Sequence, residues 1–390
     1  MSKWEWKKLK DICEKGSSNI KQSDLKDLTG DYPIFGASGY IQNVDFYQRD
    51  RDYIGIIKDG SGVGRTMLLP AFSSVIGTLQ YILPKEGNDI KFINYALQNI
   101  DFSKSVQGAA IPHIYFKDYG ETEILVPPLS EQKRIVKFLD EEFSKIDALK
   151  TNAETNLKNA KELFETTLEK ELNPPSCHSE RSEESSAELP SGWEWKTLGD
   201  VCEKISDGSH NPPKGTAANE YKMLSSKNIF NDSLNFDDPR FLTKEEFDLE
   251  NKRTNVKKGD ILLTIVGTIG RCCVFLEDEP VVFQRSVAVL KPNVSLVYSR
   301  FLMYGIIALN IEKLGRGAAQ KGVYLKQLSN ISIPLPPLSI QKEIVARLDK
   351  LSENVKRLEA NYKQIIANCD ELKKSILKKT FEGDSRSSRE

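Results

Sequence analysis

The stretch PPLSEQKRIV at residues 127–136 returns as PPLSIQKEIV at residues 336–345. A serine after two prolines is a strong helix start signal, so we expect Ser130 and Ser339 to be N-caps. Neither glycine nor proline follows either serine for about 40 residues. Each stretch therefore predicts the beginning of a long helix.

The same duplication extends to the rest of the chain. The tetrapeptide WEWK at residues 4–7 recurs at residues 193–196, and GAA at residues 108–110 recurs at residues 317–319. The spacing between copies is 189 residues for the first motif and 209 for the second, so a surplus of 20 residues lies early in the second half. Ordered blocks of this kind indicate two tandem copies of one domain plus one helix. Their middles differ greatly, which favours two binding surfaces on one architecture.

Composition limits the class of protein. A chain of 390 residues exceeds one usual hydrophobic core, and 39% apolar with 28% charged residues is ordinary for globular proteins. No stretch approaches the roughly 20 apolar residues that span a bilayer, and the N-terminus has no apolar signal segment, so we expect a cytoplasmic protein. The net charge of -1 neither favours nor excludes nucleic-acid binding. The six cysteines have no metal-site spacing and are expected to be reduced, buried thiols.

Apolar residues step by three and four along both predicted helices. The predicted seam comprises Ile135, Leu139, Ile146, Leu149 and Leu163 in the first helix, and Ile344, Leu348, Leu351, Val355, Leu358, Tyr362, Ile365, Leu372 and Ile376 in the second. A helix of this length needs a partner for its apolar stripe. We expect the two helices to pair within the chain; homodimerisation through the same seams is the alternative.

The segments before each helix are rich in short β-type runs separated by glycine turns. Residues 53–57, 260–266, 281–283 and 286–290 are expected strands, and residues 90–99 and 299–311 are expected short helices. Each globular segment is therefore predicted to be α+β.

The WEWK start, the GAA loop and the PPLSxQKxIV helix head, each present twice, resemble the specificity subunits of Type I restriction-modification enzymes. The resemblance runs from Trp4 to about Phe381. It implies two tandem pseudo-symmetric α+β target recognition domains, each followed by a long helix, with the helices paired as an antiparallel coiled coil. The expected boundaries are 1–128 and 193–337 for the recognition domains, 129–172 and 338–381 for the spacer helices, 173–192 for a flexible linker, and 382–390 for a disordered tail.

The resemblance also implies the function. Each recognition domain would read one half of a bipartite, asymmetric site in double-stranded DNA, while the helices set the gap and dock two modification subunits. This chain would have no catalytic site and no cofactor; modification subunits would use S-adenosylmethionine to methylate adenine at N6, and restriction subunits would use ATP and magnesium for translocation and cleavage. The alternative is a coiled-coil scaffold whose globular ends bind proteins.

Candidate DNA contacts are loop residues able to bond phosphates or base edges. In the first domain these are Lys58, Ser61, Arg65, His113, Tyr115 and Lys117. In the second domain they are Ser225, Lys227, Asn228, Thr268, Arg271, Gln284, Arg285, Lys321, Tyr324 and Lys326.

Motifs that suggest catalysis do not fit their classes. The glycine-rich segments 60–65 and 267–271 lack the lysine of a phosphate-binding loop and are followed by extended sequence, so they predict strand-turn-strand units. The Asn-Pro-Pro triplets at 173–175 and 211–213 lack the aromatic residue that follows this triplet in methyltransferases acting on the amino groups of DNA bases. We therefore predict no catalytic residue and no metal site.

Overall fold

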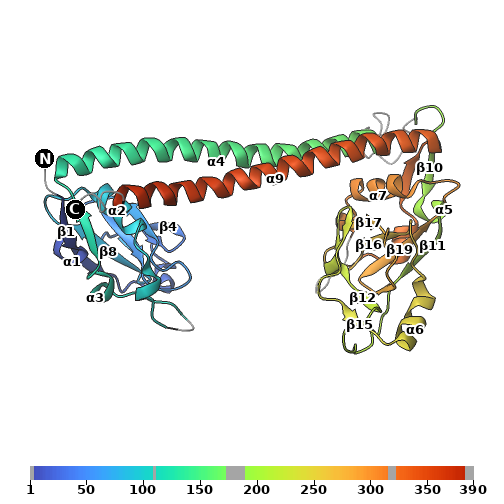
Figure 1. The fold of residues 1–390 in the computed structure, drawn as a ribbon, viewed down its shortest axis with the longest axis horizontal. Helices are drawn as coiled ribbons and strands as arrows, with labels where there is room; N and C mark the ends of the chain where they lie inside the picture. Colours follow the sequence, from blue (N-terminus) through green and yellow to red (C-terminus); the bar gives the residue numbers. More distant parts are fainter. Residues whose placement is uncertain (1–3, 109–110, 173–188, 315–321, 383–390) are drawn as a thin grey trace, which may run out of the picture. The chain divides into compact units, whose positions relative to one another are not determined.

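A computed structural model describes residues 4–108, 111–172, 189–314 and 322–382, which form two compact units. The first unit is Met1–Thr155 with Tyr362–Glu390, and the second is Asn156–Asn361. Each holds one globular domain and a segment of both long helices, α4 (Leu129–Leu172) and α9 (Leu338–Glu382). The beginning of α4 meets the end of α9 in the first unit, and the opposite ends meet in the second, so the helices are antiparallel (Figure 1).

The first domain contains three small sheets. Strand β1 (Glu5–Lys8) pairs antiparallel with β9 (Glu123–Val126). The four-stranded sheet has the order β2 (Cys13–Ser17), β8 (Leu79–Pro84), β5 (Tyr53–Ile57), β6 (Thr66–Leu69), and the three-stranded sheet has the order β4 (Gly39–Val44), β3 (Tyr32–Gly36), β7 (Ser74–Val75). The short helices are α1 (Leu9–Ile12), η1 (Gln22–Leu25), α2 (Ile90–Gln98), η2 (Phe102–Ser105) and α3 (Phe116–Tyr119).

The second domain repeats this topology. Strand β10 (Glu194–Thr197) pairs with β20 (Ser332–Leu335). The four-stranded sheet has the order β11 (Cys202–Asp207), β19 (Val287–Pro292), β16 (Ile261–Thr264), β17 (Cys272–Val274). The three-stranded sheet has the order β15 (Arg240–Phe241), β12 (Lys222–Leu224), β18 (Val281–Phe283). Its helices are α5 (Leu198–Val201), η4 (Ser226–Asn228), α6 (Lys244–Thr254), α7 (Ser299–Ala308), η5 (Ile311–Leu314) and α8 (Leu325–Ser329). The matching strand orders confirm the tandem duplication that the sequence predicts.

The surplus of the second half lies between β12 and β16. It contains the hairpin β13 (Ile229–Phe230) and β14 (Ser233–Leu234), as well as helix α6. The helix has a Thr243–Glu246 capping box and ends at Asn255 in a left-handed conformation, both of which are favourable helix ends. The extra residues therefore build independent local elements and leave the shared sheets unchanged.

Central strand β5 separates two cores, because alternate side chains of a strand point to opposite faces. Ile54 and Ile56 pack with α2 and the beginning of α4, whereas Tyr53 and Ile57 pack with the smaller sheet. In the second domain, Ile261 and Leu263 of β16 likewise pack with α7 and the long helices, whereas Leu262 faces the other core. The beginning of each long helix is thus part of its own domain's core.

The predicted turns are strand-turn-strand units. Strand β5 pairs antiparallel with β6 across residues 58–65, and β16 pairs with β17 across residues 265–271. The long helices begin at Leu129 and Leu338, so Ser130 and Ser339 lie in the first turn and are not the N-caps we predicted. The backbone oxygen of Pro128 instead accepts from the amides of Glu131 and Gln132. The predicted linker falls largely, and the predicted tail almost wholly, outside the described residues.

Five cysteines are buried free thiols: Cys13, Cys202, Cys272, Cys273 and Cys369. This confirms the prediction for those five, while Cys177 lies outside the described residues. Within the described ranges, no helix is long and apolar enough to cross a membrane.

Candidate nucleic-acid interface

In the first domain, two loops form a surface that we call the first turn surface, residues 58–65 with residues 113–117. The amide of Gly60 donates to the oxygen of Pro112 at 2.9 Å, and the amide of Ile114 donates to the oxygen of Lys58 at 3.0 Å. These bonds bring the turn after β5 against the segment before α3. All six predicted contacts of this domain lie on the two loops.

The first turn surface carries hydrogen-bond donors and an exposed aromatic ring. Ser61, Arg65 and Lys117 are exposed, and Tyr115 is 45% exposed. The Lys117 ammonium lies 5.5 Å from the centre of the Tyr115 ring, so the cation and the ring form one patch. Such a patch can bond a phosphate oxygen and pack against a sugar or base edge.

Asp59 fixes the two basic residues at the centre of this surface. Its carboxylate lies 3.0 Å from the Lys58 ammonium and 3.3 Å from Nδ1 of His113. Lys58 and His113 are half-buried. Because one carboxylate contacts both, their positions depend on each other.

The second domain assembles the equivalent surface from four segments. We call residues 225–228, 265–271, 284–286 and 322–326 the second turn surface. Three backbone hydrogen bonds join these segments. The amide of Gln284 donates to the backbone oxygen of Leu224, the amide of Ile265 to that of Ser286, and the amide of Val323 to that of Ile265. A bridge between Val266 and Gly322 corresponds to the Asp59–His113 bridge of the first domain.

The exposed side chains differ between the two surfaces. The second exposes Lys227, Thr268, Arg285, Tyr324 and Lys326, and Tyr324 is 70% exposed. Ser225 and Gln284 are half-buried, and Lys321 lies outside the described residues. The same loops thus present different hydrogen-bonding groups in the two domains.

Asn228 is wrongly predicted as a contact. It is fully buried: its side-chain oxygen accepts from the Ser225 amide at 3.0 Å, and its side-chain nitrogen donates to Asn235 and to the oxygen of Asp237. These bonds occupy the amide in holding the loop. A loop asparagine was expected to be free, but this one caps η4.

Arg271 lies at the end of the 265–271 turn, next to carboxylate side chains. Its guanidinium is 5.2 Å from the centre of the Phe230 ring, and it lines a cavity of about 660 Å³ with Glu165, Glu169 and Glu312. The negative charges of these carboxylates would repel a DNA phosphate. Arg271 is therefore a weaker candidate than the exposed residues of the same domain.

Arg253 and His210, which the sequence did not single out, lie beside the second turn surface. Asp207 accepts from Arg253 and, at 2.6 Å, bonds Nε2 of His210. Burial works against ionisation of Asp207, but these two partners hold its pKa below the ordinary value. The neighbouring Ser209 forms a bridge with Gln284. The only sequence signal was the position of His210 in a glycine- and proline-rich loop.

The helix seam differs from the prediction in its register. The buried members of the predicted seam are Ile135, Leu139, Ile146, Ile344, Leu348 and Val355. The half-buried members are Leu351, Tyr362, Ile365 and Ile376. Four predicted members are exposed by 38–52% and are corrected here: Leu149, Leu163, Leu358 and Leu372.

The correction follows from helix geometry. The covered residues recur every seven positions: Leu139, Ile146, Ala153 and Ala160 are buried, and Lys150, Leu157 and Phe164 are half-buried, whereas Leu149 and Leu163 are exposed. The exposed Leu149 and Leu163 lie one residue before Lys150 and Phe164, so the heptad repeat holds and the predicted choice of its second position was wrong. In α4 the second seam position therefore continues the Val136–Phe143 track, whose members are buried in the core of the first domain.

Comparison with known proteins identifies the class. The chain belongs to the family described as the Type I restriction modification DNA specificity domain, which matches residues 1–159 and 190–367. The two matched segments are two DNA specificity domains of the type I restriction-modification class, as the sequence resemblance predicted.

Individual relatives are similar at low identity. The MjaVIII specificity subunit of Methanocaldococcus jannaschii is 24% identical over 408 residues, covering 98% of this chain and 93% of the relative. The Escherichia coli EcoBI specificity subunit is 25% identical over 294 residues, or 72% of this chain. That match spans 62% of the relative, which is less than two thirds of its length.

Solved structures share the fold. A chain from a study of complex assembly and conformational transition of the type I restriction-modification system gives a TM-score of 0.73 at 22% identity, covering 98% of both chains. The crystal structure of the HsdS subunit from Thermoanaerobacter tengcongensis gives 0.55 at 21% identity, covering 98% of this chain and 97% of that one. The predicted fold, two α+β domains with long helices, is confirmed.

Proposed function

We propose that this chain is the non-catalytic specificity subunit of a type I restriction-modification complex, and that each domain reads one half of a bipartite, asymmetric site in double-stranded DNA. The first turn surface would read one half-site and the second turn surface the other. Residues 1–128 and 193–337 would be the two target recognition domains.

One observation carries this proposal: the same strand order holds two turn surfaces at equivalent places, and their exposed side chains differ. A shared scaffold that carries different hydrogen-bond donors suits two domains that bind DNA in the same way but recognise different base sequences. Direct readout requires such donors at base edges, and phosphate contacts require exposed cations. The exposed Arg65 and Lys117 in one domain and Arg285 and Lys326 in the other fit these roles.

The long helices would set the gap between the half-sites. Two domains read the same side of B-DNA only at separations tied to its helical turn of about 34 Å. Continuous helices of 44 and 45 residues suit a spacer of fixed length. The same helices would dock two modification subunits, which supply S-adenosylmethionine-dependent methylation of adenine, while restriction subunits supply ATP- and magnesium-dependent translocation and cleavage. The assembly would act in the cytoplasm.

The test is reconstitution. The tagged chain is co-purified with the methyltransferase subunit encoded nearest to it, the mixture is incubated with methylation-free genomic DNA and S-adenosylmethionine, and N6-methyladenine is mapped by sequencing. The controls are the methyltransferase alone and this chain alone.

A single two-part motif that depends on both proteins supports the proposal and gives both half-sites and their gap. Methylation by this chain alone would contradict its non-catalytic role. If the methyltransferase does not bind the chain, and methylates the same adenines with and without it, the proposal fails. A protein-binding scaffold then becomes the better account.

A further inference from the structure

Both domains are joined to their long helix by the same polar clamp. In the first domain, Asp140 of α4 lies 2.7 Å from the Lys91 ammonium and accepts from the Tyr95 hydroxyl at 2.6 Å. In the second, Asp349 of α9 accepts from Tyr304 at 2.7 Å and from Nη2 of Arg300 at 2.6 Å. The corresponding residues are 209 positions apart in each case, so the clamp belongs to the duplicated scaffold.

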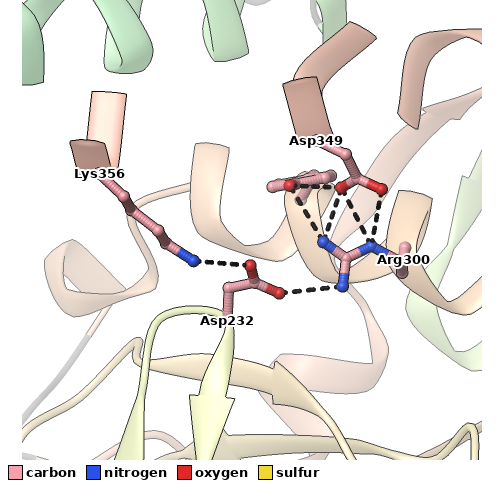
Figure 2. Close-up of polar contacts among 5 residues, drawn as sticks. Asp232, Arg300, Asp349 and Lys356 are labelled. Atoms are coloured by element: carbon pink, nitrogen blue, oxygen red, sulfur yellow. Dashed lines mark hydrogen bonds and ion pairs between the residues drawn. The ribbon is translucent and has the colours of Figure 1, made fainter. Parts of the chain in front are cut away.

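The second clamp extends one step further, to Asp232. Its carboxylate lies 3.0 Å from Nη1 of Arg300 and 3.0 Å from the ammonium of Lys356 on α9 (Figure 2). Asp232 is 18% exposed in its side chain and Arg300 is 24% exposed, whereas Lys356 is 59% exposed. The Arg300–Asp232 pair is therefore the better shielded of the two, and screening by solvent weakens the Lys356 pair.

Asp232 lies in the β13–β14 hairpin, which contacts a loop of the second turn surface. The Asp232 amide donates to the oxygen of Cys272 at 2.9 Å, and the Asn231 side chain accepts from the Cys272 amide at 3.3 Å. Phe230 packs under the guanidinium of Arg271 at the end of the 265–271 turn. A continuous set of contacts thus runs from α9 through the hairpin to this turn.

The first domain contains a shorter version of this arrangement. Within residues 4–108 and 111–155, the clamp at Asp140 comprises Lys91 and Tyr95, and β4, which pairs with β3, is followed by β5 with no hairpin between them. The hairpin belongs to the 20-residue surplus of the second half. The two recognition domains therefore differ in how their turn surfaces are attached to the helices.

We propose that Asp232 is a positioning residue that holds the second turn surface at a fixed place on α9 and thereby restricts the gap at which the second half-site is read. The inference rests on the proposed function. The hairpin contacts no base in this account; it acts by preventing the second turn surface from shifting along the helix. Loss of the carboxylate charge would permit sites whose gap is one base pair longer or shorter.

The test uses Asp232→Asn in the complete chain, reconstituted with its modification subunit. Asp232 has a φ of 59°, a conformation that asparagine also adopts, so the backbone is kept while the charge is removed. Methylation rates are measured on DNA with the native gap and with gaps changed by one base pair. The matched control is Asp248→Asn, which removes an exposed carboxylate that is paired with Lys244 within α6 of the same domain.

We expect the preference for the native gap to fall by about tenfold in Asp232→Asn, which corresponds to about 1.4 kcal/mol, with unchanged half-site bases. The control should keep the wild-type preference. Lys356→Gln removes the other partner of Asp232 on the exposed side of α9 and should give a smaller change in the same direction. This second variant decides the matter if Asp232→Asn fails to fold.

A wild-type motif together with an unchanged gap preference in Asp232→Asn, or in Lys356→Gln if only that variant folds, overturns this inference alone. A changed half-site base in Asp232→Asn would also overturn it, because that result assigns the residue to base readout. If the wild-type complex yields no two-part motif, the proposed function fails and this inference fails with it.

Discussion

Gln341 offers a direct test of how each domain is fixed to its helix. It is fully buried near the beginning of α9, where its side-chain oxygen accepts from the Tyr298 amide at 2.8 Å. Its side-chain nitrogen donates to the oxygens of Pro336 and Leu296 at 2.8 and 3.0 Å. One side chain thus joins the helix, the strand before it and the loop before α7.

Replacing Gln341 with methionine keeps the length of the side chain and its helix propensity but removes all three bonds. Each intramolecular hydrogen bond contributes about 1 kcal/mol net, so we expect Gln341→Met to lose about 3 kcal/mol of unfolding free energy. Urea-induced unfolding of the purified chain, followed by circular dichroism, measures this loss.

The duplication supplies an internal comparison. Gln132 occupies the equivalent place in the first domain, and it bonds the Asp89 amide and the Pro127 oxygen, each at 2.8 Å. Gln132→Met should therefore destabilise the first unit by a similar amount. Gln364→Met, at an exposed site bonded within α9 to Asn368, should change the free energy by less than about 0.5 kcal/mol. A loss below about 1 kcal/mol at Gln341 would refute the reasoning.

Four further outcomes are expected. Lys326→Ala should weaken DNA binding by the reconstituted complex and reduce the slope of log affinity against log salt by about 1; an unchanged slope would remove Lys326 from the phosphate contacts. Asn228→Ala should lower the unfolding free energy by about 2–3 kcal/mol in urea titration yet leave the methylated motif unchanged; a changed motif would restore it as a base contact. Burial raises the pKa of Cys13 and of Cys202 to about 12, so both thiols should react with a disulfide reagent at pH 8 only after denaturation, as mass spectrometry would show. The pKa of Asp207 is lowered in the fold, so its contribution to stability is present above about pH 4 and is lost as pH falls through the folded pKa. The unfolding free energy of Asp207→Asn should therefore depend less on pH in this range than that of the wild type. Parallel curves of unfolding free energy against pH would contradict this.

The sequence was sufficient for the architecture because the repeat compares the chain with itself. A motif such as WEWK carries little weight alone, but its second copy at a matching place defines a domain. The continuous apolar runs at residues 53–57 and 261–264 identify central strands, since both faces of each strand are covered. These signals are local and survive without any knowledge of tertiary contacts.

The seam register required tertiary information. Leu149 and Leu163 extend the heptad pattern, yet Lys150 and Phe164 are more buried. Both tracks repeat every seven residues, the one through Leu149 and Leu163 and the one through Phe143, Lys150 and Phe164. The leucines at 149 and 163 favoured the first track over the track with a lysine at 150, and the packing of Phe143 in the core of the first domain shows that the second track is covered.

Contact residues were also hard to assign, because a polar loop residue can serve either the loop or a ligand. Asn228 and Tyr324 both lie in loops of the second domain, but Asn228 is fully buried and Tyr324 is 70% exposed. An asparagine that bonds its own backbone neighbours is a common loop device. Only the hydrogen-bond partners distinguish this role from a free amide.

In each domain, the residues that dock the long helix differ from the residues that are exposed on the turn surface. Gln132 and Asp140 in one half, and Gln341 and Asp349 in the other, make corresponding contacts to their domains. The exposed residues of the turn surfaces lie on turns and short helices that carry none of these bonds. Under the proposed function, substitutions on the turn surfaces would alter recognition at little cost to docking, whereas substitutions in the clamps would affect both stability and the placement of the turn surface. The β13–β14 hairpin is the exception, since it connects a recognition loop to α9 through Asp232. Under the proposed role of Asp232, a change of specificity in the second domain would have to preserve that connection to keep a defined gap.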